Sequence, residues 1–402
     1  MFQLNRHPDY GKALDPADAA ALGVAASERA ESYLAWRGDP APTPLHGLPA
    51  LAAELGLGAL HIKDEGSRLG LGSFKALGGS YAVVQLLLEE AGRRLGRAVT
   101  MDEVQTPEVR AVASEMTFAC ATDGNHGRSV AQGAQLVGAK SAIFVHAGVS
   151  DERVAAIASF GARMIRVEGT YDDSIAEASR VAGEQGWVVV SDTAWPGYEK
   201  IPALVMQGYS VMVREALHQL PAPPSHVFMQ AGVGGVAAAV AGHLSLVLGA
   251  KRPTFVVVDP ARAACLFESA RVGYPVKVEH GEPTVMAMLE CYEPSLIAWR
   301  VLSRVADGFM TVEEEDAIAV MNRLARPRGE DPAIAAGESG GAGLAGLLRA
   351  AADPEIREAL DLDAASRVFV INTEGPTDAE RYRQLVGIAP DALASVAGGS
   401  ET

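Results

Sequence analysis

The sequence contains few cysteines, fewer basic than acidic residues, and no long uninterrupted apolar segment. Its three cysteines, Cys120, Cys265 and Cys291, are far apart and odd in number. This pattern excludes a disulfide framework and matches no zinc-ligand spacing. We therefore expect buried thiols in a reducing compartment and predict no metal site.

The charge balance limits the partners that the protein could bind. Acidic residues outnumber basic ones by 50 to 34, giving a formal net charge of −16, whereas a nucleic-acid partner would require a basic face. No window reaches the roughly 18 apolar residues of a membrane helix. Residues 1–10 also lack the apolar segment of a secretory signal. The sequence predicts a cytoplasmic protein with neither a nucleic-acid nor a membrane partner.

Short β-branched segments alternate with alanine-rich amphipathic segments along most of the chain. This alternation is typical of βαβ units with mostly parallel sheets, and 402 residues favour two domains. The expected strands are 141–145, 164–167, 187–190, 226–229, 254–258 and 368–371, and two of the expected helices are 154–160 and 175–184.

Lys75 is the first candidate site residue. It follows the glycine-containing segment Arg68-Leu-Gly-Leu-Gly-Ser-Phe74 and begins an apolar segment that ends near Leu88. A helix N-terminus there would disfavour a second positive charge and lower the pKa of the amine. A neutral amine can form a Schiff base with an aldehyde cofactor. Taken alone, such a lysine is more often a solvated side chain, so its role depends on the other motifs.

A glycine-rich segment, Gln230-Ala-Gly-Val-Gly-Gly-Val236, separates an expected strand from an alanine-rich helix. Closely spaced glycines allow backbone N–H groups to turn toward a phosphate at a helix N-terminus. The segment is not a Walker loop, because no Gly-Lys-Ser/Thr follows, and it does not match dinucleotide spacing. Phosphate binding explains the order of strand, glycines and helix better than close packing alone.

The segment Ala121-Thr-Asp-Gly-Asn-His-Gly127 predicts a tight loop. Asn125 could donate to a phenolic oxygen, Asp123 offers a carboxylate beside a reacting carbon, and we expect His126 to be a structural hydrogen-bonding residue. A plain turn before a helix is the alternative. Asp192, after the expected strand 187–190, is either an acid in a ligand crevice or a helix N-cap.

Together these segments resemble the fold type II pyridoxal-phosphate enzymes, the tryptophan synthase β and threonine dehydratase superfamily. Within it, the chain is similar to the diaminopropionate ammonia-lyase family. The similar segments follow one another in order from about residue 40 to about residue 380: Pro42-Thr-Pro-Leu45, Ile62-Lys-Asp-Glu65, Ser73-Phe-Lys-Ala-Leu-Gly-Gly79, Ala121-Thr-Asp-Gly-Asn-His-Gly-Arg128, Ser191-Asp-Thr-Ala-Trp195, Lys200-Ile-Pro202, Met206-Gln-Gly-Tyr209, Gly232-Val-Gly-Gly235, Gly337-Glu-Ser-Gly340 and Asn372-Thr-Glu-Gly375.

The resemblance implies an α/β fold of two three-layer αβα domains with mostly parallel sheets, like tryptophan synthase β. Residues 1–80 and 210–402 would form a large cofactor-binding domain. Residues 81–209 would form a smaller mobile domain that closes over the substrate. The resemblance also implies pyridoxal 5′-phosphate as the cofactor, a small amino acid as the substrate, and a homodimer.

The resemblance implies roles for most of the site residues. Lys75 would carry the cofactor and move the Cα proton, and Asp123 and Asp192 would be the two acids at the substrate. Phe74 would contact the cofactor ring, Asn125 its 3′-oxygen, and Thr373 its ring nitrogen. The phosphate would bind Gly232, Val233, Gly234 and Gly235, and Tyr171 would lie near the substrate beside the two acids. Independently of the resemblance, Ser73 and Thr122 carry hydroxyls of the kind that hold a substrate carboxylate, and Met288 and Glu290 are further candidate substrate contacts.

The segment Thr284–Pro294 departs from the family pattern, which usually has small residues at the positions of Met288, Glu290 and Tyr292. Two interpretations stay open. Either this is variation in a surface loop, or the pocket is reshaped for a larger amino acid whose amine or guanidinium meets Glu290.

The sequence therefore predicts a pyridoxal-phosphate-dependent carbon–nitrogen lyase. It would convert 2,3-diaminopropionate, or an N-substituted or larger relative, by β-elimination to an aminoacrylate that hydrolyses to pyruvate and ammonia. One alternative is a lyase for a β-substituted amino acid whose cationic distal group is held by Glu290. The others are a serine/threonine-type hydroxyamino-acid dehydratase and an inactive binding protein with the same fold.

Overall fold

The computed structural model describes residues 1–122 and 124–393, which form two compact units. Unit 1 comprises Met1–Val24, Pro42–Phe74 and Met212–Thr402, and unit 2 comprises Ala25–Ala41 and Lys75–Val211. The chain passes between them four times: inside α2 (Val24–Arg37), between Ala41 and Pro42, directly before Lys75, and inside α9 (Lys200–Gln219).

The sequence-based division at 80/81 and 209/210 lies close to two of these changeovers, but it leaves Ala25–Ala41 with the larger part. The expected closure of residues 81–209 over the substrate stays a prediction.

The sheet of unit 1 has the strand order β1-β10-β9-β8-β11-β3-β2. The inner strands run parallel, and the short edge strands β1 and β2 pair antiparallel with their neighbours. In that order the strands are Phe2–Leu4, Gly308–Val312, Thr254–Pro260, His226–Gln230, Arg367–Asn372, Ala59–Asp64 and Leu45–Gly47. Every residue of β8 and β10 is buried, as expected for strands covered on both faces.

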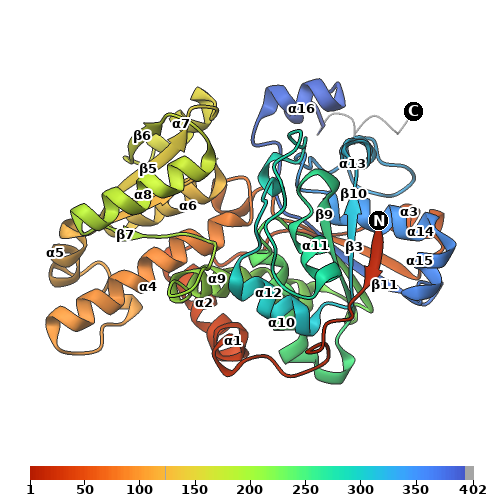
Figure 1. Ribbon diagram of the computed structural model, residues 1–402, viewed down its shortest axis with the longest axis horizontal. Helices are drawn as coiled ribbons and strands as arrows, with labels where there is room; N and C mark the ends of the chain where they lie inside the picture. The colour runs from red at the N-terminus through yellow and green to blue at the C-terminus, as the bar shows by residue number, and fades with distance from the viewer. Residues whose placement is uncertain (123, 394–402) are drawn as a thin grey trace. The chain divides into compact units, whose positions relative to one another are not determined.

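Opposite faces of this sheet contact different helices. Phe228 and Met310 belong to a core cluster that includes Leu344 and Leu347 of α14. Because successive side chains of a strand alternate in direction, Phe309 points to the other face, where its ring lies 6.2 Å from the Trp299 ring of α12. In Figure 1, α11 and α12 are on one side of this sheet and α13 and α14 are on the other.

Unit 2 contains a parallel sheet in the order β6-β5-β4-β7, formed by Arg163–Val167, Lys140–His146, Thr117–Ala121 and Val188–Val189. Ala119 and Phe144 face α8, where they meet Ala178 and Ala182. Ile143 faces the other way, toward α6. Unit 2 therefore has three layers.

The remaining helix bounds complete both units. Unit 1 contains α1 Pro16–Leu22, α3 Pro49–Glu54, α10 Gly235–Leu248, α11 Cys265–Val272, α12 Leu296–Val305, α13 Glu314–Ala325, α14 Ala342–Ala352, α15 Pro354–Ala359 and α16 Ala379–Val386. Unit 2 contains α4 Lys75–Leu95, α5 Pro107–Glu115, α6 Asn125–Val137, α7 Asp151–Ala158 and α8 Tyr171–Gln185.

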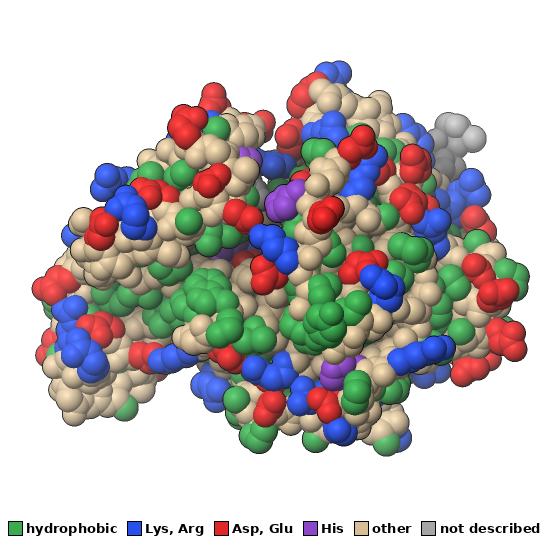
Figure 2. Space-filling view, viewed as in Figure 1, with side chains coloured by type: hydrophobic (Ala, Val, Ile, Leu, Met, Phe, Trp, Pro, Cys, Tyr) green, Lys and Arg blue, Asp and Glu red, His purple; other side chains and the backbone are tan. Residues whose placement is uncertain are grey.

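The expected α/β fold with two layered, mostly parallel sheets is confirmed. All six predicted strands and both predicted helices are present, with ends that differ by a few residues. Within the described residues, no helix is both long and apolar enough to cross a membrane. Acidic and basic side chains are interspersed on the face shown in Figure 2.

Candidate active site

Lys75 is the first residue of α4, where the backbone changes from paired strand to helix. Directly before it, Ser73 forms a β-bridge with Glu374, and the Phe74 N–H donates to the Thr373 carbonyl at 2.9 Å. The lysine therefore lies at the helix N-terminus predicted from the sequence, with 22% of its side chain exposed.

Lys75 Nζ forms an ion pair with the Asp192 carboxylate. Asp192 follows β7, and the next helix begins only at Lys200, so Asp192 is not a helix N-cap. Burial raises the pKa of Asp192, but the charge of Lys75, the nearby His126 and the hydrogen bonds that Asp192 accepts together outweigh burial and hold that pKa well below its usual range. Asp192 is consequently ionised at neutral pH.

Tyr198 fixes the backbone on which Asp192 is carried. Its hydroxyl donates to the Val189 carbonyl at 2.8 Å and accepts from the Ser191 N–H at 3.0 Å. The Tyr198 ring stacks on Trp195 with a centroid separation of 4.1 Å. These contacts on both sides of the strand end restrict where the Asp192 carboxylate can lie.

His126 holds the same strand end from α6. Its Nε2 lies 2.8 Å from the Val190 carbonyl, and because a carbonyl only accepts, Nε2 must carry the hydrogen. Burial lowers the pKa of His126, so the ring is neutral and its Nδ1 has no hydrogen. Among the described residues Nδ1 has no hydrogen-bond partner. The contact with Val190 is the structural hydrogen bond expected of this histidine.

Tyr209 of α9 is a residue of this region for which the sequence indicated no role. It is fully buried, which raises its pKa, and the charges of Lys75 and Asp192 both act on its hydroxyl. Gly78 makes room for it, since a Cβ there would lie 2.5 Å from the Tyr209 ring. The segment Met206-Gln-Gly-Tyr209 was the only sequence signal, and it indicated family resemblance without a role.

The loop between β4 and α6 is stabilised by Thr122. Its Oγ1 accepts the N–H groups of Gly124 and Gly127, both at 3.1 Å. A Cβ at Gly127 would lie 2.3 Å from Thr122 Cγ2 and 3.1 Å from Ile143, so the helix begins very close to the loop. Asn125 is buried as the first residue of α6.

The roles assigned to the site residues stay predictions, including those of Asp123 and Tyr171. Asp123 lies outside the described residues. Tyr171 is half-buried as the first residue of α8, and its carbonyl accepts from Ser174 Oγ at 2.7 Å.

In unit 1 the glycine-rich segment joins β8 directly to α10, as predicted. Gly234 has a φ of +94°, which favours glycine, and it immediately precedes the helix. Among the hydrogen bonds of the described chain, the N–H groups of Gly232, Val233, Gly234 and Gly235 donate to no protein acceptor. Buried N–H groups need partners, and unpaired ones at a helix N-terminus fit a phosphate.

Thr373 lies in the same unit and is 3% exposed. Its Oγ1 accepts from Gln230 Nε2 at 2.9 Å, so the first residue of the glycine-rich segment contacts the residue expected at the cofactor ring nitrogen. Phe74 is 9% exposed and pairs with the Thr373 backbone. The backbone donors, the hydroxyl and the aromatic ring of unit 1 therefore fit the phosphate and the ring of pyridoxal phosphate.

The segment Thr284–Pro294 contacts the glycine loop. A Cβ on Gly232 would lie 2.9 Å from Cys291 Sγ and 3.3 Å from Leu289 Cα. The Met288 N–H donates to Ser339 Oγ at 3.1 Å. The departure from the family pattern therefore concerns a segment beside the loop that would bind phosphate.

Glu290 of this segment is held by two neighbours. Its carboxylate accepts from the Tyr292 hydroxyl at 2.7 Å and from the Thr284 N–H at 3.3 Å. The Tyr292 ring in turn stacks on His280 with a centroid separation of 3.8 Å. The two oxygens are oriented, and a carboxylate can accept further hydrogen bonds.

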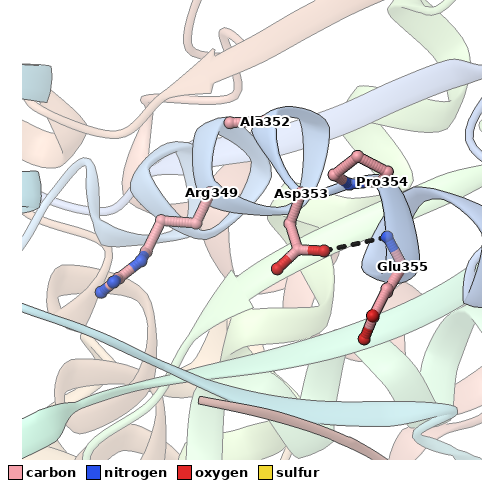
Figure 3. Close-up of a pocket in the computed structure, with 5 residues that line it drawn as sticks. All are labelled: Arg349, Ala352, Asp353, Pro354 and Glu355. Atoms are coloured by element: carbon pink, nitrogen blue, oxygen red, sulfur yellow. Dashed lines mark hydrogen bonds between the residues drawn. The ribbon is translucent and has the colours of Figure 1, made fainter.

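A surface hollow of unit 1 contains none of these residues. It is lined by Arg349, Ala352, Asp353, Pro354 and Glu355. Asp353 caps α15 by accepting from the Glu355 N–H at 2.9 Å (Figure 3), and Arg349 pairs with Asp316. No group of three metal-ligating side chains occurs in residues 1–122 and 124–393.

A family model described as pyridoxal-phosphate dependent enzyme matches residues 37–374. The chain belongs to this family, and pyridoxal phosphate is its cofactor. The processed form of threonine deaminase isoform 2 from Solanum lycopersicum shares the fold, with a TM-score of 0.69 at 19% identity over 96% of this chain and 98% of that one. Fold type II and the predicted cofactor are thereby confirmed.

Within that class the chain belongs to the diaminopropionate ammonia-lyase family. It is 39% identical over 359 residues to the enzyme of Escherichia coli strain K12, covering 88% of this chain and 89% of the relative. It is 38% identical over 357 residues to that of Salmonella typhimurium, covering 86% and 88%. The Escherichia coli structure with an aminoacrylate–pyridoxal phosphate azomethine reaction intermediate superimposes with a TM-score of 0.85, at 34% identity over 96% and 97% of the two chains. The predicted family and ammonia-lyase class are confirmed.

Proposed function

We propose that this protein catalyses the pyridoxal-phosphate-dependent β-elimination of 2,3-diaminopropionate. The observation that carries the proposal is the ion pair of Lys75 with an ionised Asp192 at the start of α4. The family relationship and the aminoacrylate found with the Escherichia coli relative support it. The products would be ammonia and 2-aminoacrylate, which takes up water to give pyruvate and a second ammonia.

When bound, pyridoxal phosphate withdraws electrons from the Cα of the amino acid. Lys75 Nζ would remove the Cα proton, and the Asp192 carboxylate would stabilise the ammonium formed. Because Asp192 is ionised beside Lys75, Asp192 is not the neutral acid that the leaving amine needs. Lys75 Nζ itself would then pass its proton to the departing β-nitrogen, leaving Asp123 as the second acid of the site.

The other predicted residues would bind and orient. The N–H groups of Gly232 to Gly235 would hold the phosphate, Phe74 and Thr373 would contact the ring, and Asn125 its 3′-oxygen. Ser73 and Thr122 would bind the substrate carboxylate, with Tyr171 and Met288 at the rest of the substrate.

A substrate panel tests the proposal. The purified protein with bound cofactor is mixed with D- and L-2,3-diaminopropionate, D- and L-serine, and L-threonine, and keto acid and ammonia are measured. We expect two ammonia molecules per pyruvate from diaminopropionate, and only slow release from the hydroxyamino acids. Lys75→Ala should abolish turnover and the visible absorption of the bound cofactor, with Lys12→Ala as the exposed control. Preferential turnover of serine or threonine would favour the dehydratase alternative, and no turnover would favour a binding protein.

A second candidate substrate is an amino acid with a cationic distal group, such as a β-guanidino derivative. The contacts of Glu290 with Tyr292 and Thr284, in a segment that touches Gly232, favour it. Glu290→Gln should raise KM for the guanidino substrate about tenfold or more and leave KM for diaminopropionate nearly unchanged. Glu293→Gln, an exposed acid of the same segment, is the control. Equal KM changes for both substrates would exclude this role.

We also propose that the protein is a homodimer, as the family resemblance implies, and that it is cytoplasmic, as its few and widely spaced cysteines indicate. Sedimentation of the purified protein measures its oligomeric state, and cell fractionation measures its location.

A further inference from the structure

Gln230 is the last residue of β8 and is completely buried. Its amide Nε2 lies 2.5 Å from the Gly340 carbonyl, 3.0 Å from the Ile371 carbonyl and 2.9 Å from Thr373 Oγ1. Since these neighbours are all oxygens, the amide nitrogen must face them, because the reverse orientation would place the Gln230 carbonyl oxygen against them. Gly343 leaves space for the side chain, because a Cβ there would lie 2.7 Å from Gln230 Oε1.

This arrangement determines what the Thr373 hydroxyl can do. An amide nitrogen has no lone pair to accept a hydrogen bond, so Thr373 cannot donate to Gln230 and only accepts from it. Within the described part of the chain, no protein atom accepts the Thr373 hydroxyl hydrogen. The nearly buried Thr373 hydroxyl oxygen already accepts a hydrogen bond, so its hydrogen is available to donate to a ligand.

We infer that Gln230 is a positioning residue that keeps Thr373 a hydrogen-bond donor toward the ring nitrogen of pyridoxal phosphate. The inference rests on the proposed contact of Thr373 with that ring. A nitrogen that accepts a hydrogen bond from a hydroxyl stays unprotonated. Gln230 therefore maintains the less electron-withdrawing form of the cofactor, which suits β-elimination better than transamination.

The test uses two ligands that differ at the ring nitrogen. Apoprotein is titrated with pyridoxal phosphate and with its carbocyclic analogue, in which a CH replaces that nitrogen. In Gln230→Met, the Gly340 and Ile371 carbonyls lose their donor and draw the Thr373 hydroxyl toward themselves. Affinity for pyridoxal phosphate should fall about fivefold, somewhat less than the loss of one neutral hydrogen bond. Affinity for the analogue should not change.

Thr373→Val provides the reference for the whole contact. It should lower affinity for pyridoxal phosphate about tenfold and spare the analogue. Adding Gln230→Met to it should cause no further loss, because coupled residues are non-additive. The absorption maximum of bound pyridoxal phosphate should shift in both single variants. Gln3→Met removes a comparable amide bond, to the Phe267 carbonyl at 2.6 Å, and should change neither affinity nor spectrum.

The outcomes distinguish the inference from the proposed function. If Thr373→Val discriminates between the ligands but Gln230→Met does not, the inference is overturned and the Thr373 contact stands. If Thr373→Val lowers the affinities for the two ligands equally, then the role inferred for Gln230 and the proposed contact of Thr373 with the ring are both wrong. The proposed β-elimination is tested separately, by the turnover of the substrate panel. Where Gln230→Met does not fold, Gln230→Glu replaces it, because an oxygen facing Thr373 would accept its hydroxyl. Equal affinity of Gln230→Glu and the wild-type protein for pyridoxal phosphate would overturn the inference.

Discussion

Asp192 carries a negative charge in a partly buried position because Lys75 lies against it. Taking either partner away leaves the other charge without compensation, which costs more than breaking a fully exposed ion pair. The charges of both residues also act on Tyr209, and its hydroxyl stays protonated because burial raises its pKa. The chemistry at this site therefore depends on the protonation states of Lys75, Asp192 and Tyr209 together.

Replacing Asp192 with asparagine should separate charge from shape. Lys75 would keep a neighbour of the same size but lose the countercharge, so we expect kcat for diaminopropionate to fall by roughly 10²–10³-fold, with KM changed much less. Steady-state kinetics measures both. Asp39→Asn, at an exposed position, serves as the control.

The same ion pair determines the pH profile. Because the pKa of Asp192 lies well below its usual range, its ionisation adds no acid limb to kcat/KM of the wild-type enzyme between about pH 5 and 8. A limb near pH 4 or below would agree with this direction. An acid limb at about pH 5 to 8 that disappears in Asp192→Asn would contradict it.

At the scale of elements, the glycine loop and α10 form one unit with the segments packed beside them. Gly234 has a φ of +94°, and a Cβ on it would lie 3.0 Å from Ala298 Cβ and from Leu266 Cδ1. The loop therefore has little room to move. Its N–H groups, which have no acceptor among the described residues, are held in position for a ligand.

Gly234→Ala should weaken cofactor binding by about tenfold or more and destabilise the protein by about 1–3 kcal/mol. Gly273→Ala is the matched control, since Gly273 has a φ of +85° in the same unit but open space around it. Gly273→Ala would introduce the same kind of backbone strain without displacing the glycine-rich segment after β8. Calorimetry and cofactor titration give the two quantities, and equal loss of cofactor affinity in both variants would contradict a specific role of the loop.

The elements differ in how far the sequence predicts them. The strands of β8, β9 and β11 and the loop after β8 were predictable because local patterns define them. The edge strand β1 was not, because it pairs with residues 308–310 at the other end of the chain. The attachment of Ala25–Ala41 to unit 2 likewise depends on contacts that no local pattern shows.

The residues of the candidate site also differ in how far the sequence predicts them. Lys75, Asp192 and the glycine loop were identified from short motifs whose chemistry is recognisable. Tyr198 and Gln230 were not, because each acts through a contact between segments far apart in sequence or across a loop. Side-chain positions of this kind become visible only once the fold is known.

At the scale of the whole molecule, one buried acid should dominate the pH dependence of stability. Asp259 has no exposure, and burial raises its pKa to about 8, although it accepts the Leu266 and Phe267 N–H groups at 3.0 and 2.8 Å. In the unfolded chain this carboxyl loses its proton near pH 4. As pH rises from about 4 to 8, only the unfolded state releases the proton, so the free energy of unfolding falls.

Asp259→Asn removes this titration and keeps an oxygen for both N–H groups. Between about pH 5 and 7 the wild-type protein should lose about 2 kcal/mol more of its unfolding free energy than the variant does. Urea unfolding of the apoprotein at several pH values measures the difference, with Asp39→Asn as the control. Parallel pH profiles of variant and wild type would show that Asp259 is ionised in the folded state.

The position of β11 has a consequence for synthesis on the ribosome. The strand occupies the middle of the unit 1 sheet, between β8 and β3, yet it consists of residues 367–372. While the chain is being made, β3 and β8 have no common neighbour until nearly all of it has emerged. The four strands of unit 2 are complete by Val189. Nascent chains that stop after residue 220 should therefore already contain the unit 2 sheet, whereas the cofactor-binding loop of unit 1 reaches its final surroundings only in the last moments of translation.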